Sequence, residues 1–248
     1  VTGQTLAKVY GTAVAPGASI DASALRPKDG PLATVLTGGT TSTSAGAPDS
    51  AAVGAYATSP VAALTARGAA QRYALVLVDG TLTVTPAPLT VTANDATRTY
   101  GAANPAFSAT YAGFVLGEGP GVLGGTLTFA TPATPASPVG SYAITPSGLT
   151  SGDYAITFVP GTLTVTPAPL TVTANDATRP EGQPNPPFSA TYAGFVLGEG
   201  PGVLGGTLAF ATPATPASPP GAYPIAPSGL TSGNYAIIFV NGLLTITP

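Results

Sequence analysis

The sequence contains no cysteine, histidine, methionine or tryptophan. Without cysteine the chain forms no disulfide and offers no thiolate for zinc binding or nucleophilic catalysis. Without histidine it lacks the commonest general base and the commonest ligand of transition metals. We therefore expect no catalytic residue, no metal site and no cofactor, and we predict that the chain is not an enzyme.

Charged residues are also scarce, at 7% of the 248 residues, against roughly 25% in average proteins. The 7 basic residues form no cluster, so nucleic acid is an improbable partner. Disorder is not expected, because 44% of the residues are hydrophobic and the net charge is only −3. No apolar run approaches the roughly 18–20 residues of a membrane span. The start at Val1 is not a signal peptide and reads as a cut through a longer chain.

What the sequence does contain is internal repetition. Residues 88–167 recur at 169–248 with 65 of 80 aligned positions identical. Residues 1–86 form a diverged copy, in which Val9-Tyr10-Gly11 aligns with Thr99-Tyr100-Gly101. Copy one carries insertions of 4 and 5 residues, which we expect in loops. We predict three domains and name residues 1–86, 87–167 and 168–248 copy one, copy two and copy three.

Alternation of large apolar and small or hydroxyl residues dominates each copy, as in Leu163-Thr164-Val165-Thr166. Such alternation is typical of half-buried antiparallel strands. We predict a mainly β fold, with three small antiparallel β-sandwich or β-grasp-like modules of five or six strands. Val159-Pro160-Gly161 has the composition of a hairpin turn. Residues 131–138, with proline at every third position, predict an extended polyproline-like stretch.

The copies meet at two identical tripeptides, Pro86-Ala87-Pro88 and Pro167-Ala168-Pro169. Proline fixes φ and favours extended conformations in the residue before it. These short Pro-Ala-Pro linkers therefore predict similar, nearly straight joints and a semi-rigid rod.

Charged side chains recur at fixed positions of the repeat. Lys8, Arg98 and Arg179 share one position, and a loop carries an acidic residue before glycine at Asp29, Glu118 and Glu199. General acid–base catalysis needs two titratable groups in opposed environments, which one cation and one carboxylate per copy do not supply. We interpret these residues as intradomain salt bridges or solvated charges.

Calcium and sugar binding are the remaining site hypotheses. Calcium takes about 6–8 oxygen ligands, whereas the acidic residues of copy two, Asp95, Glu118 and Asp153, are spread along the chain. Tyrosines beside threonines could form a sugar-binding face. Aromatic residues that alternate with small ones are usually core, so we interpret Tyr142 and Tyr154 as structural, with the hydroxyl at the edge of the core.

Two sequence features resemble a known family. Copy two opens with Leu-Thr-Val-Thr-Ala-Asn-Asp, followed by Tyr100-Gly101-Ala102-Ala103-Asn104-Pro105, and closes with residues 154–165. Together they are similar to MBG domains of the YGX type, found in tandem arrays in large secreted bacterial adhesins of the filamentous-haemagglutinin-like kind. Copy three departs from the pattern, because Pro180-Glu181-Gly182 replaces Thr99-Tyr100-Gly101.

The resemblance implies a secreted, extracellular or cell-surface location and a stalk or adhesive role without catalytic residues. We predict a structural repeat segment, a stalk or filament, of a secreted bacterial surface adhesin. The alternative is an array of carbohydrate- or protein-binding modules that act by avidity. Expected partners are the adjacent repeats of the chain, further copies in a filament, and a surface glycan or protein.

Overall fold

The computed structural model describes residues 1–23 and 25–248. They form two compact units, the first made of residues 1–92, 109–128 and 146–159 and the second of residues 93–108, 129–145 and 160–248. Copy one lies in the first unit and copy three in the second, while copy two is divided between them.

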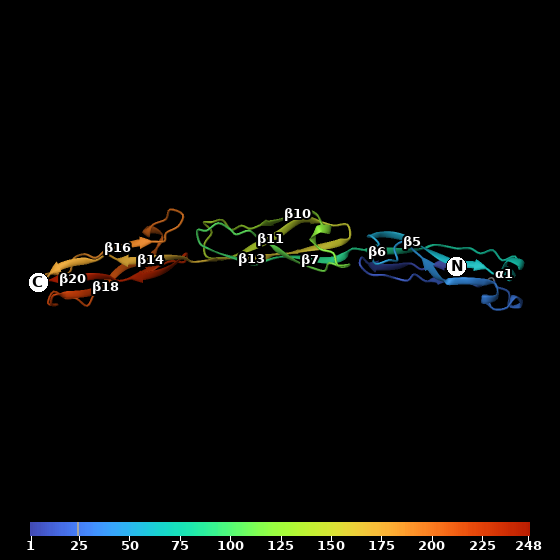
Figure 1. The fold of residues 1–248 in the computed structure, drawn as a ribbon, viewed down its shortest axis with the longest axis horizontal. Coiled ribbons are helices and arrows are strands. Elements are labelled where there is room, and N and C mark those ends of the chain that lie inside the picture. The colour runs from blue at the N-terminus through green and yellow to red at the C-terminus, as the bar shows by residue number, and fades with distance from the viewer. Residues whose placement is uncertain (24) are drawn as a thin grey trace. The chain divides into compact units, whose positions relative to one another are not determined.

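Copy three, drawn in orange to red in Figure 1, contains seven strands and one 3-10 turn. They are β14 (Ala168–Ala174), β15 (Ala177–Pro180), β16 (Ala190–Ala193), η4 (Pro201–Val203), β17 (Gly205–Ala211), β18 (Gly221–Thr231), β19 (Tyr235–Val240) and β20 (Gly242–Thr247). One sheet has the order β16-β14-β19 and the other the order β15-β20-β18-β17. The mainly β class predicted from the alternation is confirmed, with seven strands in place of five or six.

The predicted antiparallel pairing is wrong for part of each sheet. Strand β14 runs parallel to β19, with Leu170 opposite Ile237, and β20 runs parallel to β15, with Ile246 opposite Arg179. The other pairings, β14 with β16, β17 with β18 and β18 with β20, are antiparallel. Alternation reports that one face of a strand is buried and carries no information on the direction of its neighbour.

Copy one contains six strands, two 3-10 turns and one helix within its described residues. They are β1 (Thr2–Gly3), β2 (Leu6–Val9), β3 (Ala18–Ser19), η1 (Pro27–Asp29), η2 (Leu32–Thr34), β4 (Leu36–Thr43), β5 (Gly54–Leu64), α1 (Ala66–Ala70) and β6 (Gly80–Thr85). Its larger sheet has the order β2-β6-β5-β4, with β2 parallel to β6, as β15 is to β20 in copy three. Helix α1 lies in the five-residue insertion, outside the strands as expected.

Copy two has the same seven strands and one 3-10 turn as copy three. They are β7 (Ala87–Ala93), β8 (Ala96–Thr99), β9 (Ala109–Ala112), η3 (Pro120–Val122), β10 (Gly124–Ala130), β11 (Gly140–Thr150), β12 (Tyr154–Val159) and β13 (Gly161–Thr166). The expected hairpin at Pro160 is wrong, because β12 pairs with β7 whereas β13 pairs with β11 and β8. Pro160 therefore connects two different sheets.

The proline-rich stretch is not extended. The Ser137 amide donates to the Thr134 carbonyl oxygen at 2.9 Å, and the Thr134 amide donates to the Ser137 hydroxyl at 2.9 Å. Ala133 is buried against Ile144 and Leu163. Hydrogen bonds and an apolar contact thus fold the segment into a turn, despite its prolines.

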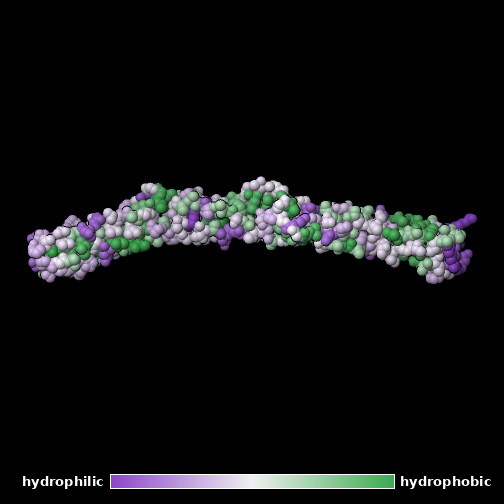
Figure 2. Space-filling model, in the orientation of Figure 1, coloured by the Kyte–Doolittle hydropathy of each residue, from purple (hydrophilic) through white to green (hydrophobic). Residues whose placement is uncertain are grey.

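The predicted core faces inward. The alternation predicts twelve core residues in copy two, of which five are buried (Val91, Ile144, Tyr154, Leu163 and Val165) and seven are half-buried (Phe107, Phe114, Leu127, Phe129, Tyr142, Ile156 and Phe158). Leu89, which the prediction omitted, is also buried. On the face drawn in Figure 2, hydrophilic residues form only small, separate groups, as expected for a chain with 7% charged residues.

The joints occur at the predicted tripeptides but are shorter than predicted. Ala87 and Ala168 already belong to β7 and β14 and are only 1% and 2% exposed. Their amides donate to the carbonyl oxygens of Asp153 and Asn234 at 2.9 and 3.0 Å. Only Pro86 and Pro167 therefore lie between the strands of consecutive copies.

Candidate functional site

A polar arrangement that occurs twice surrounds these two joints. Joint one connects copies one and two around Tyr10, Glu118 and Tyr154, all within the first unit. Joint two connects copies two and three around Tyr100, Glu199 and Tyr235, all within the second unit.

The Tyr-Gly pair of each joint follows directly after a strand. Tyr10 follows β2 and its amide donates to the Thr85 carbonyl oxygen at 2.9 Å; Tyr100 follows β8 and its amide donates to the Thr166 carbonyl oxygen at 2.8 Å. These bonds extend the parallel ladders β2–β6 and β8–β13 by one residue. The tyrosine side chain is thereby fixed at the last position of its sheet, next to the following copy. We call this Tyr-Gly position the tyrosine end of a copy.

One carboxylate accepts hydrogen bonds from two tyrosines that belong to consecutive copies. The Tyr10 hydroxyl donates to Glu118 Oε1 at 2.9 Å, and the Tyr154 hydroxyl donates to Glu118 Oε2. In joint two, the Tyr100 hydroxyl donates to Glu199 Oε1 at 2.8 Å and the Tyr235 hydroxyl to Glu199 Oε2. We call the glutamate and the tyrosine of its own copy the acid end.

The tyrosine rings add an apolar contact to this polar one. Tyr10 and Tyr154 pack edge to face, with ring centroids 5.6 Å apart and planes at 80°. Tyr100 and Tyr235 repeat the arrangement at 5.6 Å and 82°. Tyr154 and Tyr235 are each only 4% exposed, so the hydrogen bonds to the glutamates are largely shielded from water.

The glycine of each tyrosine end permits the close approach. Gly11 and Gly101 have φ values of +83° and +81°, which disfavour any other residue. A Cβ atom on Gly11 would lie 2.4 Å from Val115 Cγ2, and one on Gly101 would lie 2.3 Å from Val196 Cγ2. Glycine is therefore required by the backbone and also by the neighbouring copy.

A second contact crosses each joint. The Val53 amide donates to Asp153 Oδ1 at 3.0 Å, and the Val139 amide donates to Asn234 Oδ1 at 3.1 Å. Aspartate and asparagine both supply the required acceptor. This explains how the contact survives the replacement of aspartate by asparagine between copies two and three.

The joints also raise the pKa values of their tyrosines. The hydrogen bond to Glu118, followed by burial, raises the pKa of Tyr10 to about 12. The hydrogen bond to Glu199, followed by burial, raises the pKa of Tyr100. Burial, followed by the hydrogen bond to the glutamate, raises the pKa of Tyr154 and of Tyr235. All four hydroxyls are therefore protonated at neutral pH and available as donors.

The recurrent cations occupy a different place, inside the copies. Arg98 is buried and donates from Nε to Asn104 Oδ1 at 2.8 Å and from its two terminal nitrogens to the carbonyl oxygens of Thr99 and Thr134. Arg179 has the same partners one repeat later, and Lys8 donates to two carbonyl oxygens. The interpretation as salt bridges or solvated charges is wrong for Arg98 and Arg179, because neutral oxygens of the same copy bind them.

The carboxylates considered for calcium serve separate contacts. Asp95 Oδ1 accepts from the Thr162 amide, Asp153 Oδ1 accepts from the Val53 amide, and Glu118 lies in joint one. Across residues 1–23 and 25–248, no group of three or more Asp or Glu residues is placed to hold a metal ion.

The sequence analysis named Tyr154, Glu118 and Glu199 as candidate residues but did not predict which tyrosine binds which glutamate. Tyr154 was interpreted as structural, with its hydroxyl at the edge of the core, and the bond to Glu118 agrees with this. Tyr142 also bonds structurally, to the Pro138 carbonyl oxygen at 2.8 Å. Pairing Tyr100 with Glu199 from sequence alone would have required knowing that they lie at facing ends of consecutive copies.

Several solved structures of tandem β domains are distantly similar to the chain. The Drosophila N-cadherin EC1-4 structure is 10% identical over 79% of this chain, with a TM-score of 0.29; this chain covers 58% of its length. The titin I9-I11 tandem is 11% identical over 100% of this chain and 97% of its own, with a TM-score of 0.26. No curated protein sequence matches the chain.

A family of known sequence pattern does match. The sequence model of the MBG domain (YGX type) matches residues 89–164 and again residues 170–245, which together make up more than half of the chain. Both matches contain an acid end, at Glu118 and Tyr154 and at Glu199 and Tyr235, and the first also contains the tyrosine end at Tyr100 and Gly101. The chain belongs to the MBG domain (YGX type) family.

Proposed function

We propose that the chain is a structural repeat segment, a stalk or filament, of a secreted bacterial surface adhesin. The observation that carries the proposal is the repeated joint, in which one glutamate binds a tyrosine of each neighbouring copy. A spacer must hold consecutive domains in a fixed relation, and the joint provides contacts suited to that task.

Each joint combines contacts of different kinds. The covalent path is a single proline with a restricted φ, and the next strand starts at once in a parallel ladder with its own copy. Within the acid end, Tyr154 donates to Glu118 of the same copy. One tyrosine–carboxylate hydrogen bond, from Tyr10 to Glu118, one ring contact and one amide–side-chain bond then connect the copies. Rotation about the proline would break all of them together, so the joint resists bending and twisting.

Small-angle X-ray scattering tests the spacer role. We expect an elongated profile for the native chain and a broader distribution of interatomic distances for the double variant Tyr10→Phe/Tyr100→Phe. The control is Tyr142→Phe/Tyr223→Phe, which removes two hydroxyls that bond within their own copies, to Pro138 and Pro219. A globular native profile, or equal effects of the two double variants, would contradict the proposal.

Secretion to the cell surface is the second part of the proposal. Membership of the MBG family supports it, because the family resemblance implies an extracellular setting. Among the described residues, no helix is long and apolar enough to cross a membrane. Labelling of intact source cells with an antibody against the chain should give a surface signal that external protease removes. A signal that appears only after lysis would contradict this location.

We further propose that the chain is not an enzyme and does not bind nucleic acid. Of the residues that could have formed a site, Glu118, Asp153 and Tyr154 are engaged in joint one, and Asp95 and Tyr142 bond within copy two. This supports the structural role over the carbohydrate- or protein-binding alternative. A glycan array tests that alternative, because specific binding that survives replacement of the joint tyrosines would favour it. Sedimentation analysis at high protein concentration tests whether copies in a filament make lateral contacts.

A further inference from the structure

The first and last segments of copy three lie side by side and run in the same direction. Strand β14 is parallel to β19, beginning with Ala168 opposite Tyr235, and β15 is parallel to β20, ending with Pro180 opposite Thr247. Paired residues are 67 positions apart at both ends (235 − 168 and 247 − 180). The two segments therefore keep one register while they pass from one sheet to the other. We call the pairing of residues 168–180 with residues 235–247 the long ladder of copy three.

The long ladder is maintained at the point where the segments change sheets. Between β14 and β15 a side chain supplies the acceptor, because the Leu243 amide donates to Asp176 Oδ1 at 2.7 Å, again over 67 positions. Gly242 allows the two segments to approach closely here, since a Cβ atom on it would lie 2.4 Å from the Ala174 carbonyl oxygen. The change of sheet therefore does not interrupt the contact between the two segments.

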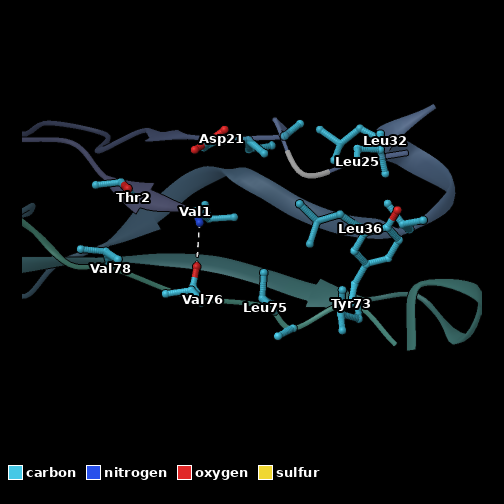
Figure 3. Close-up of a pocket in the computed structure, with 15 residues that line it drawn as sticks. Val1, Thr2, Asp21, Leu25, Leu32, Leu36, Tyr73, Leu75, Val76 and Val78 are labelled. Carbon is cyan, nitrogen blue, oxygen red and sulfur yellow. Dashed lines mark hydrogen bonds between the residues drawn. The ribbon is translucent and has the colours of Figure 1, made fainter. Parts of the chain in front are cut away.

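Copies one and two pair their first and last segments in the same way. In copy two, β7 is parallel to β12 and β8 is parallel to β13, and the Thr162 amide donates to Asp95 Oδ1 at 2.7 Å over 67 positions. In copy one, β2 is parallel to β6, and the Val1 amino group donates to the Val76 carbonyl oxygen at 2.7 Å (Figure 3). The parallel pairing of the first and last segments is thus a property of the module.

The covalent chain is attached at opposite ends of this pairing. It enters copy two through Pro86, directly before β7, and leaves it through Pro167, directly after β13. Tension along the chain therefore pulls two parallel segments in opposite directions along their own axes. No pair can separate in this geometry unless its neighbours are displaced too, so the hydrogen bonds of the ladder bear the load together. Strands pulled apart from one end would instead lose their pairs one after another.

The ends and the inner face of the long ladder are protected. The Ala168 amide donates to the Asn234 carbonyl oxygen at 3.0 Å, and the Glu181 amide donates to the Thr247 carbonyl oxygen at 2.8 Å. Four apolar residues of its strands are at most 2% exposed (Leu170, Val172, Leu244 and Ile246). Backbone hydrogen bonds in such buried surroundings open less readily than exposed ones.

We propose that copies two and three are mechanical clamps, in which the parallel pairing of the first and last segments bears tension transmitted along the chain. The single register across both sheets carries the proposal, because it lets the whole length of a copy share the load. Its biological meaning rests on the proposed stalk role, since a stalk transmits the load on its tip. Resistance to force is nevertheless a property of each copy and is measured on the purified chain.

Single-molecule force spectroscopy tests the clamp by pulling copy three in two directions. The chain contains no cysteine, so two introduced cysteines define the points of attachment in the full-length sequence. Pro169→Cys/Pro248→Cys places these points at opposite ends of the long ladder, whereas Glu181→Cys/Pro248→Cys places both at the same end. All three positions are exposed. At equal pulling speed, we expect the first variant to unfold at several times the force of the second.

The length of released chain identifies the part that unfolds. At roughly 3.6 Å per residue, residues 169–248 release at most about 280 Å and residues 181–248 at most about 240 Å. Equal unfolding forces in the two directions would overturn the inference. A globular scattering profile would instead contradict the stalk role and would leave these forces unchanged.

A second set of variants tests the bond at the change of sheet. In the Pro169→Cys/Pro248→Cys background, Asp176→Ala removes the acceptor for the Leu243 amide and should lower the unfolding force. Asp176→Asn keeps an acceptor and should restore most of it. The matched control is Asn175→Ala, which removes a bond to Ser189 Oγ at 2.8 Å, outside the long ladder, and should leave the force unchanged. Equal losses for Asp176→Ala and Asn175→Ala would also overturn the inference.

Discussion

Replacing the glycine of a tyrosine end by alanine separates the role of the backbone from that of the joint. Gly101 and Gly182 occupy equivalent positions, with φ values of +81° and +76°. A Cβ atom on Gly101 would meet Val196 Cγ2 at 2.3 Å, whereas one on Gly182 would meet nothing within 4 Å. The two substitutions therefore share the backbone strain and differ in the clash across joint two.

The expected magnitudes follow from this difference. The left-handed backbone costs alanine about 1–2 kcal/mol at either position. Forcing additional atoms into a packed contact costs a further 1–3 kcal/mol or so. We expect Gly101→Ala to lower the free energy of unfolding by about 2–5 kcal/mol and Gly182→Ala by about 1–2 kcal/mol.

Urea-induced unfolding of the full chain, followed by far-UV circular dichroism, measures both values. Gly11→Ala provides a repeat of the experiment in joint one, because its Cβ would lie 2.4 Å from Val115 Cγ2. Equal destabilisation by Gly101→Ala and Gly182→Ala would refute the reasoning, since it would mean that copies two and three do not meet closely at this position.

The remaining predictions concern the hydroxyl–carboxylate bonds, the buried cation, pH and metals. A double-mutant cycle of Tyr100→Phe and Glu199→Gln should give a coupling energy of about 1.5–3 kcal/mol, and additive effects would contradict the bond. Arg98→Ala should destabilise by about 1–3 kcal/mol, because it leaves buried carbonyl and amide oxygens unpaired, whereas Arg67→Ala, at an exposed position, should be neutral within error. The pKa of Tyr10 is raised to about 12 from 10.0, so its contribution to the free energy of unfolding is complete below pH 10 and is lost as the pH rises toward 12. Urea melts across this pH range should show the free energy of unfolding decline, and the decline should be smaller in the variant Tyr10→Phe. EDTA should leave the melting temperature unchanged, and a fall reversed by calcium would contradict the absence of a metal site.

The sequence predicted which side chains face the core but not whether neighbouring strands are parallel or antiparallel. In Leu163-Thr164-Val165 the apolar residues are buried and the threonine is exposed, as the alternation required. The parallel pairing of β13 with β8 depends on long connections, whose path is set by the turn around Thr134 and by Asn104, which bonds to both Arg98 and Ala133. The bonds from Asn104 to Ala133 and from Arg98 to Thr134 join residues 29 and 36 positions apart, and no local sequence pattern predicts them.

The joints illustrate the same limit. The tripeptide Pro167-Ala168-Pro169 placed joint two correctly, but proline stiffness was only part of the reason for a fixed joint. The larger part comes from Tyr100 and Glu199, which are 99 residues apart. The tyrosines at the position of Glu181 in the other copies, Tyr10 and Tyr100, each bind a glutamate of the next copy.

The boundaries of the sequence repeats do not coincide with those of the compact units of the structure. The boundary between the units passes through copy two and leaves each joint inside one unit. The apolar clusters explain why: Tyr10 and Val84 of copy one pack with Ala87, Leu89 and Tyr154 of copy two. In the second unit, Tyr100 and Val165 of copy two pack with buried residues of copy three. Part of the core of each copy is therefore completed by its neighbour, as in other repeat proteins that cannot bury their apolar surface alone.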